Sequence, residues 1–242
     1  MNVCHFIFDH LSRIYLYQKI DPETHFFISE NYQYYKDALI RYVDNSNLIF
    51  SNKKRVSIQC SKLLISSNIL NDFKHPAHYG NIDLLNFLRK IPLSRENLPR
   101  LKIYISRSDA STRKIINEDL LLPELLSRWY LVVNLTKLSF EDQATLFSRA
   151  SHVIGQHGAG LTNLIYSPTD CKILEIFNPY YGTWSFWHIF NQLKFEYYSY
   201  VSSDPVLPTP DYQKMSHDSH HGQRNIILDI DHFLQFLDSN SF

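Results

Sequence analysis

Three glycines and a histidine stand close together in residues 153–163, VIGQHGAGLTN, directly after an apolar run. The chain of 242 residues has only 6 glycines. Those in this stretch are Gly155, Gly158 and Gly160. Glycine permits positive φ and close approach of a ligand, and the N-terminus of the short helix expected at 160–166 attracts anions. We interpret the turn as a cradle for a nucleotide diphosphate with His157 at its rim. The alternative is a tight turn that only packs against a sheet, since neither G-x-G-x-x-G nor a P-loop is present.

Two arginines upstream offer fixed positive charge. Arg107 directly follows a predicted strand, 101–106, and therefore should lie at the carboxyl end of a sheet, where open parallel sheets bind ligands. Arg113 falls in the first turn of a helix predicted over 111–128. With backbone N–H groups from Gly158 to Leu161, both would stabilise the negative charge that grows on a departing diphosphate. Each arginine has a simpler alternative role, as a solvated or ion-paired surface residue.

Two further polar residues stand in apolar surroundings. Glu175 lies inside KILEIF, residues 172–177, a predicted strand in which an unpaired carboxylate is costly to bury. Hydrogen bonds to ribose hydroxyls would satisfy this carboxylate, as would a neighbouring arginine in a purely structural role. Asn163 either contacts the same ligand or caps the short helix, and we expect Thr162 to be a cap.

A histidine and an aspartate near the start of the chain form a candidate acid–base pair. His5 and Asp9 are four residues apart, so on a helix both project from one face. Asp9 is the candidate general base for an incoming hydroxyl group, with His5 orienting or charge-tuning it, and the reverse order is also open. The alternative is a surface pair of small energetic value.

Alternating strand and helix patterns after residue 100 must position these residues. The alternation predicts βαβ units and a parallel sheet, hence a doubly wound α/β domain. The predicted strands are 101–106, 130–135, 152–156, 172–177 and 195–201. The predicted helices are 111–128, 140–150, 160–166 and 183–193. Ser139 with Asp142 should cap the second of these helices.

The first hundred residues alternate less cleanly and predict a smaller α/β layer. Its helices are expected at 5–19, 32–42 and 81–91, and its strands at 25–29 and 47–50. Residues 92–99 should form a linker and 202–223 a loop. We therefore predict one domain over 1–95 and a second over 96–224, with the amphipathic C-terminal helix 225–238 completing the first.

Composition excludes several classes of protein. Hydrophobic residues make up 44% of the chain, charged residues 20%, and the formal net charge is zero, which indicates a globular protein and argues against a nucleic-acid partner. The three cysteines lack C-x-x-C spacing, so neither a disulfide framework nor a zinc site is expected. No apolar run approaches the roughly 20 residues of a membrane span, and the start does not resemble a signal peptide. These features favour a cytoplasmic protein with at most peripheral membrane association.

Three segments, in order, resemble glycosyltransferase family 61. LFSRASHVIGQHGAGLTNLIYSPTDCKILEIF, residues 146–177, resembles the core signature of that family. YISRSDASTRKIINE, residues 104–118, resembles its arginine-rich segment, with Arg107 and Arg113 at the matching places. NVCHFIFD, residues 2–9, resembles its N-x-x-H-x-x-x-D element through Asn2, His5 and Asp9.

The resemblance implies an inverting hexosyl- or pentosyltransferase that takes sugar from a nucleotide-sugar donor, UDP being the commonest nucleotide, and passes it to a glycan acceptor. It also implies the fold class α/β, GT-B-like, with two Rossmann-like doubly wound domains facing a cleft, the N-terminal acceptor-side domain being small. No obligatory metal or other cofactor is expected. The site residues carried over are catalytic Asp9 and His5, and donor-binding Arg107, Arg113, His157, Gly158, Ala159, Gly160, Asn163 and Glu175.

Two other functions compete with this one. LDID, residues 228–231, imitates the D-x-D motif of GT-A transferases, so Asp229 and Asp231 could hold a metal ion. The histidine clusters at 75–78 and 217–222 lack partner carboxylates at ligand spacing, so no metal is expected there. The short first domain also fits a glycan- or nucleotide-binding module without catalysis.

Overall fold

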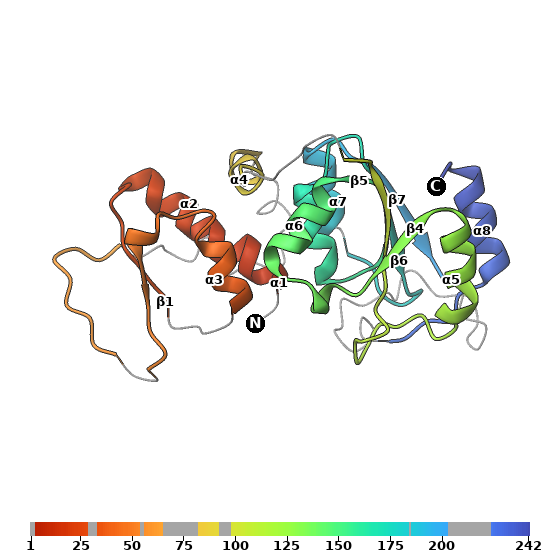
Figure 1. Cartoon of the computed structure of the whole chain (residues 1–242), viewed down its shortest axis with the longest axis horizontal. Helices are drawn as coiled ribbons and strands as arrows, with labels where there is room; N and C mark the ends of the chain where they lie inside the picture. The colour runs from red at the N-terminus through yellow and green to blue at the C-terminus, as the bar shows by residue number, and fades with distance from the viewer. Residues whose placement is uncertain are drawn as a thin grey trace.

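The chain folds into a mixed α/β structure with two parallel sheets (Figure 1). The computed structural model describes residues 3–28, 33–53, 56–64, 82–91, 98–183, 185–202 and 224–242. The predicted linker at 92–99, the predicted loop at 202–223 and both histidine clusters lie wholly or mostly outside these residues. Among the described helices, none has the length and apolar character needed to cross a membrane.

A five-stranded parallel sheet carries the second part of the chain. Its strands are β3 (Leu101–Ile105), β4 (Tyr130–Val133), β5 (Ala150–Gln156), β6 (Lys172–Phe177) and β7 (Glu196–Val201). Their order is β4-β3-β5-β6-β7, and every neighbouring pair is parallel. From β3 the chain passes to β4 on one side of it and then crosses to β5 on the other side. The topological switch point therefore lies between β3 and β5. In such sheets ligands bind beyond the carboxyl ends of the strands at that point.

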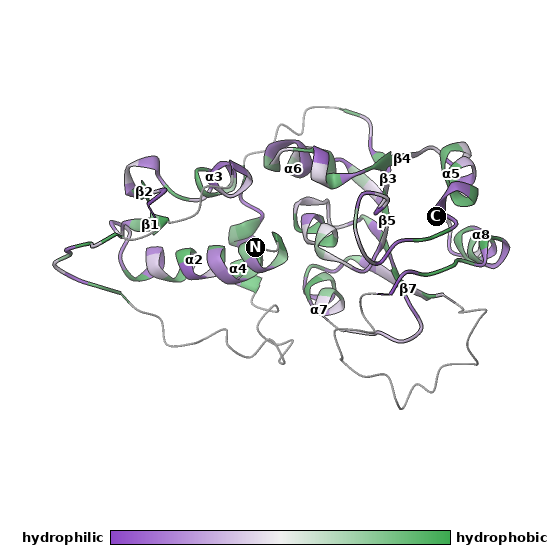
Figure 2. Cartoon of the chain, turned by 90° about the horizontal axis from the view of Figure 1, so that it is seen from below, coloured by the Kyte–Doolittle hydropathy of each residue, from purple (hydrophilic) through white to green (hydrophobic). Residues whose placement is uncertain are grey.

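Helices cover both faces of this sheet, which confirms a doubly wound α/β fold for this part. Side chains alternate along each strand, so that Ile103, Val153 and Ile173 face one core while Tyr104, Ile154 and Leu174 face the other. The first face carries α6 (Phe140–Ser148), the 3₁₀ helix η5 (Ala159–Tyr166) and α7 (Ser185–Gln192). The second carries α5 (Glu118–Ser127) and α8 (Ile230–Ser239), and Figure 2 shows hydrophobic and hydrophilic residues side by side on these flanking helices.

The position of α8 corrects one prediction, because this helix does not complete the N-terminal part. Phe233 and Leu237 of α8 are fully buried in the core on the far face of the five-stranded sheet (Figure 1). The segment that precedes α8 is bound to the second part as well. The Asn117 side chain donates to the Leu228 carbonyl at 2.8 Å and accepts from the Leu228 N–H at 2.9 Å.

Two helix boundaries also differ from prediction. Helix α5 begins at Glu118 rather than near 111, because residues 107–117 form turns in which Arg113 takes a positive φ of 58°. Helix α8 begins at Ile230, where Asp229 caps it by accepting from the His232 N–H. The predicted cap at Ser139 is confirmed, since its hydroxyl oxygen accepts from the Asp142 N–H at 3.1 Å.

The N-terminal part is smaller and mainly helical. It contains α1 (Val3–His5), a π-helical turn η1 (Phe6–His10), α2 (Leu11–Ile20), α3 (Gln33–Leu39) and α4 (Ile82–Leu88). Its strands β1 (Phe26–Ile28) and β2 (Leu48–Phe50) pair in parallel around α3 as one βαβ unit. The described residues of this part therefore have two strands, and a second doubly wound domain stays a prediction.

The two parts share one hydrophobic core. Buried residues of both, such as Leu11 and Leu85 on one side and Phe140 and Leu164 on the other, belong to the same cluster. Polar contacts reinforce this junction. The Arg89 guanidinium donates to the Ile165 carbonyl at 2.7 Å, the hydroxyls of Tyr42 and Tyr166 lie 3.2 Å apart, and Arg41 pairs with Glu141 at 2.5 Å. The N-terminal part is thus seated on α6 and η5, directly behind the glycine turn.

Candidate functional site

The glycine turn joins β5 to η5 at the switch point, but its glycines do not have the expected positive φ. Gly158 is extended, with φ 165° and ψ 172°, and no glycine of the described residues has a positive φ in the left-handed range. Close packing explains the glycines instead. A Cβ atom on Gly158 would lie 2.7 Å from Arg107 Nη1, and one on Gly160 would lie 2.9 Å from Leu135 Cδ1.

Arg107 and Arg113 lie together at this turn, although Arg113 precedes α5 and does not lie in its first turn as predicted. Arg107 donates from Nε to the Arg113 carbonyl at 3.1 Å and from Nη2 to the Thr112 carbonyl at 3.3 Å. Arg113 donates from Nη1 to the carbonyl of His157 at 3.2 Å. Backbone carbonyls therefore hold both guanidinium groups at the carboxyl ends of β3 and β5.

The two arginines leave positive charge unbalanced. Burial, followed by the charge of Arg113, lowers the pKa of Arg107 to about 10, although Asp109 acts in the opposite direction. Burial also lowers the pKa of Arg113. No ion pair of the described residues includes either arginine, and Arg113 Nε is buried without a hydrogen-bond partner in that part of the chain. An anion at this place would relieve the repulsion and occupy the free donors.

His157 and Glu175 form a buried pair beside the arginines. His157 Nδ1 lies 2.5 Å from Glu175 Oε1, and the hydroxyl of Tyr197 donates to Glu175 Oε2 at 2.7 Å. The side chains of His157 and Glu175 are 12% and 1% exposed. Glu175 is thus satisfied by a histidine and a tyrosine, rather than by the arginine that the sequence suggested as an alternative.

Asn163 is 1% exposed and supports the turn from behind. Its amide nitrogen donates to Gln143 Oε1 at 2.8 Å and to the Gly160 carbonyl at 3.2 Å, while its oxygen is buried without a partner among the described residues. Thr162 is not the predicted cap, because Gly158 at the N-cap of η5 has no side-chain cap and Thr162 is buried inside the helix.

A cavity of about 690 Å³ opens between the two parts next to these residues. From the second part it is lined by Arg107, Ala159, Gly160 and Asn163, and from the first part by Val3, Tyr34 and Asp37. Sequence reasoning missed Tyr34 and Asp37, because only the packing of α3 onto α6 brings them to the glycine turn.

His5 and Asp9 form the predicted pair. His5 Nδ1 lies 3.0 Å from Asp9 Oδ2, and the two side chains are 46% and 12% exposed. Both residues belong to the helical run whose first described residue is Val3. Val3 lines the cavity, whereas His5 and Asp9 do not. Asn2, the third residue of this element, lies outside the described residues.

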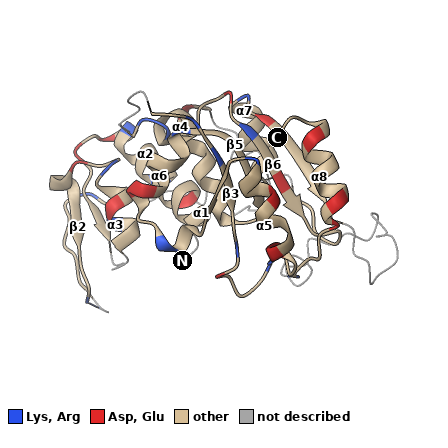
Figure 3. Cartoon of the chain, turned by 45° about the vertical axis from the view of Figure 1, so that its right-hand side comes forward, with Lys and Arg blue, Asp and Glu red and all other residues tan. Residues whose placement is uncertain are grey.

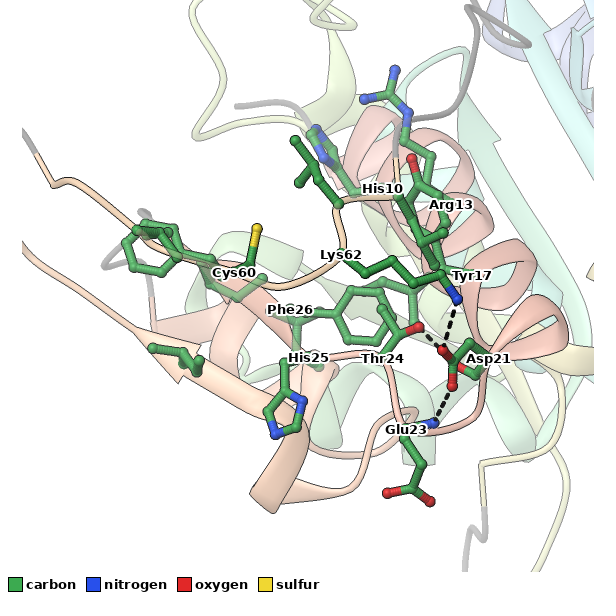
Figure 4. Close-up of a pocket in the computed structure, with 18 of the residues that line it drawn as sticks. His10, Arg13, Tyr17, Asp21, Glu23, Thr24, His25, Phe26, Cys60 and Lys62 are labelled. Atoms are coloured by element: carbon green, nitrogen blue, oxygen red, sulfur yellow. Dashed lines mark hydrogen bonds and ion pairs between the residues drawn. The ribbon is translucent and has the colours of Figure 1, made fainter.

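A larger cavity, about 1160 Å³, lies within the N-terminal part (Figure 4). Aromatic residues such as Tyr17 and Phe26 line it, and Lys62 pairs with Asp21 at its edge at 3.3 Å. None of the predicted site residues lines this cavity, which separates it from the arginine pair.

The candidate metal motif has a structural role. Asp229 is the N-cap of α8, and no group of three or more histidine, cysteine, aspartate or glutamate residues in the described ranges is arranged to hold a metal ion. Asp231 lies in the first turn of the same helix.

Alanine at Gly158 and at Gly160 should have contrasting effects. At Gly158 the new methyl group meets the terminal guanidinium of Arg107 and not the packed core, so we expect the melting temperature to hold while affinity for inorganic pyrophosphate falls about tenfold. At Gly160 it meets packed Leu135, so overpacking should cost about 1–3 kcal/mol of unfolding free energy. Titration calorimetry and thermal melting measure both. Unchanged pyrophosphate affinity in Gly158→Ala would show that Arg107 beside Gly158 does not bind the anion.

The amino-acid sequence resembles that of known proteins. The sequence model of the family described as glycosyltransferase 61 matches residues 3–174. EGF domain-specific O-linked N-acetylglucosamine transferase of Drosophila melanogaster is 36% identical over 85 residues, a match that covers 33% of this chain and 16% of that relative. The chain therefore matches only a small share of the length of this curated relative.

Proposed function

The chain belongs to the glycosyltransferase 61 family, and from this premise we propose that it moves a sugar from a UDP-sugar to a hydroxyl group of a glycan. Membership of the family confirms the recognition made from the sequence. The nucleotide, the inverting course, the GT-B arrangement and the acceptor are parts of the proposal.

The observation that carries the proposal is the pair of half-buried arginines at the switch point. Arg107 and Arg113 have no carboxylate partner within the described ranges, and Arg107 lines the cavity between the two parts. Guanidinium groups bind phosphate oxygens through charge-assisted, often bidentate hydrogen bonds. The pyrophosphate of the donor is therefore assigned to this place.

The same residues assist departure of the nucleotide. As the bond between the sugar carbon and the phosphate oxygen breaks, its electron pair goes to the diphosphate, whose negative charge grows. Donors fixed in advance stabilise that charge at no cost of reorganisation. Two guanidinium charges can serve this purpose without an obligatory metal ion.

The His5–Asp9 pair is proposed to accept the proton of the attacking hydroxyl. The His5 side chain is more exposed than that of Asp9, which favours His5 as the base and Asp9 as the residue that orients it. This is the reverse of the assignment named first from the sequence. Asp9 contacts Nδ1 of the ring and thereby orients the imidazole that is proposed to take the proton of the acceptor hydroxyl. The oxygen then attacks the sugar carbon opposite the leaving phosphate, which inverts the configuration at that carbon.

The cavity between the two parts is the proposed entrance for the acceptor. It is bounded by Tyr34 and Asp37 of α3 and by Arg107 and Gly160 of the second part. We propose that an acceptor-side domain over 1–95 faces the donor-side part of the chain across this cavity, as in the GT-B fold. Figure 3 shows acidic and basic residues spread over both parts, which suits a neutral glycan better than a polyanion.

A panel of nucleotides tests the proposal. Saturating UDP, at about 100 times its Kd, should stabilise the fold by about 2.7 kcal/mol, and uridine should do so much less because it lacks the phosphates. A UDP-sugar should be hydrolysed slowly without an acceptor, and EDTA should change neither result. A chain that no nucleoside diphosphate stabilises would overturn the proposal. Activity abolished by EDTA would favour the metal-dependent alternative, and UDP binding without turnover a binding module.

A further inference from the structure

Glu175 is the most deeply buried carboxylate of the candidate site, and both of its oxygens are occupied. Oε1 lies 2.5 Å from His157 Nδ1, and Oε2 accepts the Tyr197 hydroxyl at 2.7 Å. A buried carboxylate depends on such partners, because removing one leaves a charge without compensation in an apolar core. Glu175 is therefore oriented from two sides, by the glycine turn and by strand β7.

The sheet register brings Tyr197 to this place. Strand β7 lies next to β6, with Glu175 opposite Ser199 and Ile173 opposite Tyr197. Tyr197 is thus the diagonal neighbour of Glu175 on the same face, within reach of a long aromatic side chain. Burial and the negative charge of Glu175 raise the pKa of Tyr197 well above its usual value, so its hydroxyl stays a donor.

His157 connects Glu175 to the arginine pair, through its ring on one side and its main-chain carbonyl on the other. Its ring stacks on Phe177 with centroids 5.3 Å apart and lies against Tyr181 at 5.2 Å. Its carbonyl oxygen accepts from Arg113 Nη1 at 3.2 Å. A continuous series of contacts therefore runs from Tyr197 through Glu175 and His157 to Arg113.

We propose that Tyr197 is a positioning residue of the phosphate site, which holds Glu175 so that Glu175 anchors the His157 side chain and, with it, the main-chain carbonyl that binds Arg113. Tyr197 is not among the residues that line the cavity between the two parts. The inference rests on the proposed function for its effect on UDP, whereas the link between Tyr197 and His157 does not depend on it.

The test compares Tyr197→Phe with Tyr198→Phe. Tyr198 is the matched control, because it lies on the same strand and donates to the exposed Glu196 side chain at 2.6 Å, on the opposite side of the strand from Glu175. We expect Tyr197→Phe to weaken UDP binding about three- to tenfold and Tyr198→Phe to leave it unchanged. Raised donor KM with a smaller change of kcat distinguishes positioning from general loss of activity.

A second readout does not require UDP. In ¹H–¹⁵N spectra of the unsubstituted protein, the Nδ1–H of His157 should be observed and protected from exchange, and Tyr197→Phe should shift or broaden this signal while Tyr198→Phe does not. An unaffected His157 signal in folded Tyr197→Phe would overturn the inference. So would an unsubstituted protein in which Nε2 is the only protonated nitrogen of His157, a result that needs no variant to fold. If UDP does not bind but the His157 signal moves, the proposed function fails while the link stands.

Discussion

Replacement of Arg107 by alanine is expected to weaken UDP binding by about 100-fold or more, with little change in the stability of the fold. Each hydrogen bond between a guanidinium and a phosphate contributes about 1.5–3 kcal/mol, and two such bonds account for the loss. Arg107 is held among like charge with a lowered pKa, so its cation is disfavoured in the folded state and its removal should not destabilise the protein. Arg113→Ala should show a similar loss.

Titration calorimetry with UDP measures this effect, and two variants sharpen it. Arg100→Ala is the matched control, because Arg100 precedes the same strand, at its amino end, and pairs with Asp170 at 3.0 Å. Its UDP affinity should equal that of the unsubstituted chain. Arg107→Lys should recover only part of the affinity, because an ammonium group lacks the planar fork of guanidinium. Equal UDP affinity in Arg107→Ala and Arg100→Ala would remove the basis of the proposed donor site.

The second large effect is expected at His5. Loss of a general base slows the reaction about 10²–10⁴-fold, so His5→Ala should reduce sugar transfer within that range while UDP affinity stays the same. Asp9→Asn should slow transfer less, because the amide can still orient the ring although it does not support the charge that forms on it. Steady-state kinetics with saturating donor measure both variants.

His10→Ala serves as the control for His5→Ala. His10 belongs to the same helical run but lines the larger cavity of the N-terminal part (Figure 4). Transfer should therefore persist in His10→Ala. If His5→Ala retains full activity, the base lies elsewhere, and the cavity-lining carboxylate Asp37 becomes the first residue to examine.

Much of the second part could be predicted from the sequence, because its strands are short apolar runs between polar turns. The strand at 172–177 has the predicted bounds, and Arg107 lies next to Gly158 because these residues follow two neighbouring strands. The start of α5 could not be read from local pattern, since its N-terminal neighbours are held by tertiary contacts such as that of Asn117 with Leu228. Because residues 111–117 also have helical spacing, the prediction wrongly extended α5 into the turn that precedes it.

The parts of the site that escaped prediction depend on register or on packing between distant segments. Tyr197 reaches Glu175 only because β7 pairs with β6 in one particular register, which cannot be determined from the sequence alone. The conformation of Gly158 was predicted wrongly for a related reason. Its missing side chain makes room for Arg107, a contact between residues about fifty apart, and does not serve local backbone freedom.

A crystal structure of the chain with bound UDP tests the central claim most directly. We predict that the phosphate oxygens lie within about 3.2 Å of the guanidinium nitrogens of Arg107 and Arg113, beside Gly158, with the distal phosphate facing the cavity between the two parts. Phosphates bound in the cavity of the N-terminal part, or at the amino ends of the five strands, would contradict the account.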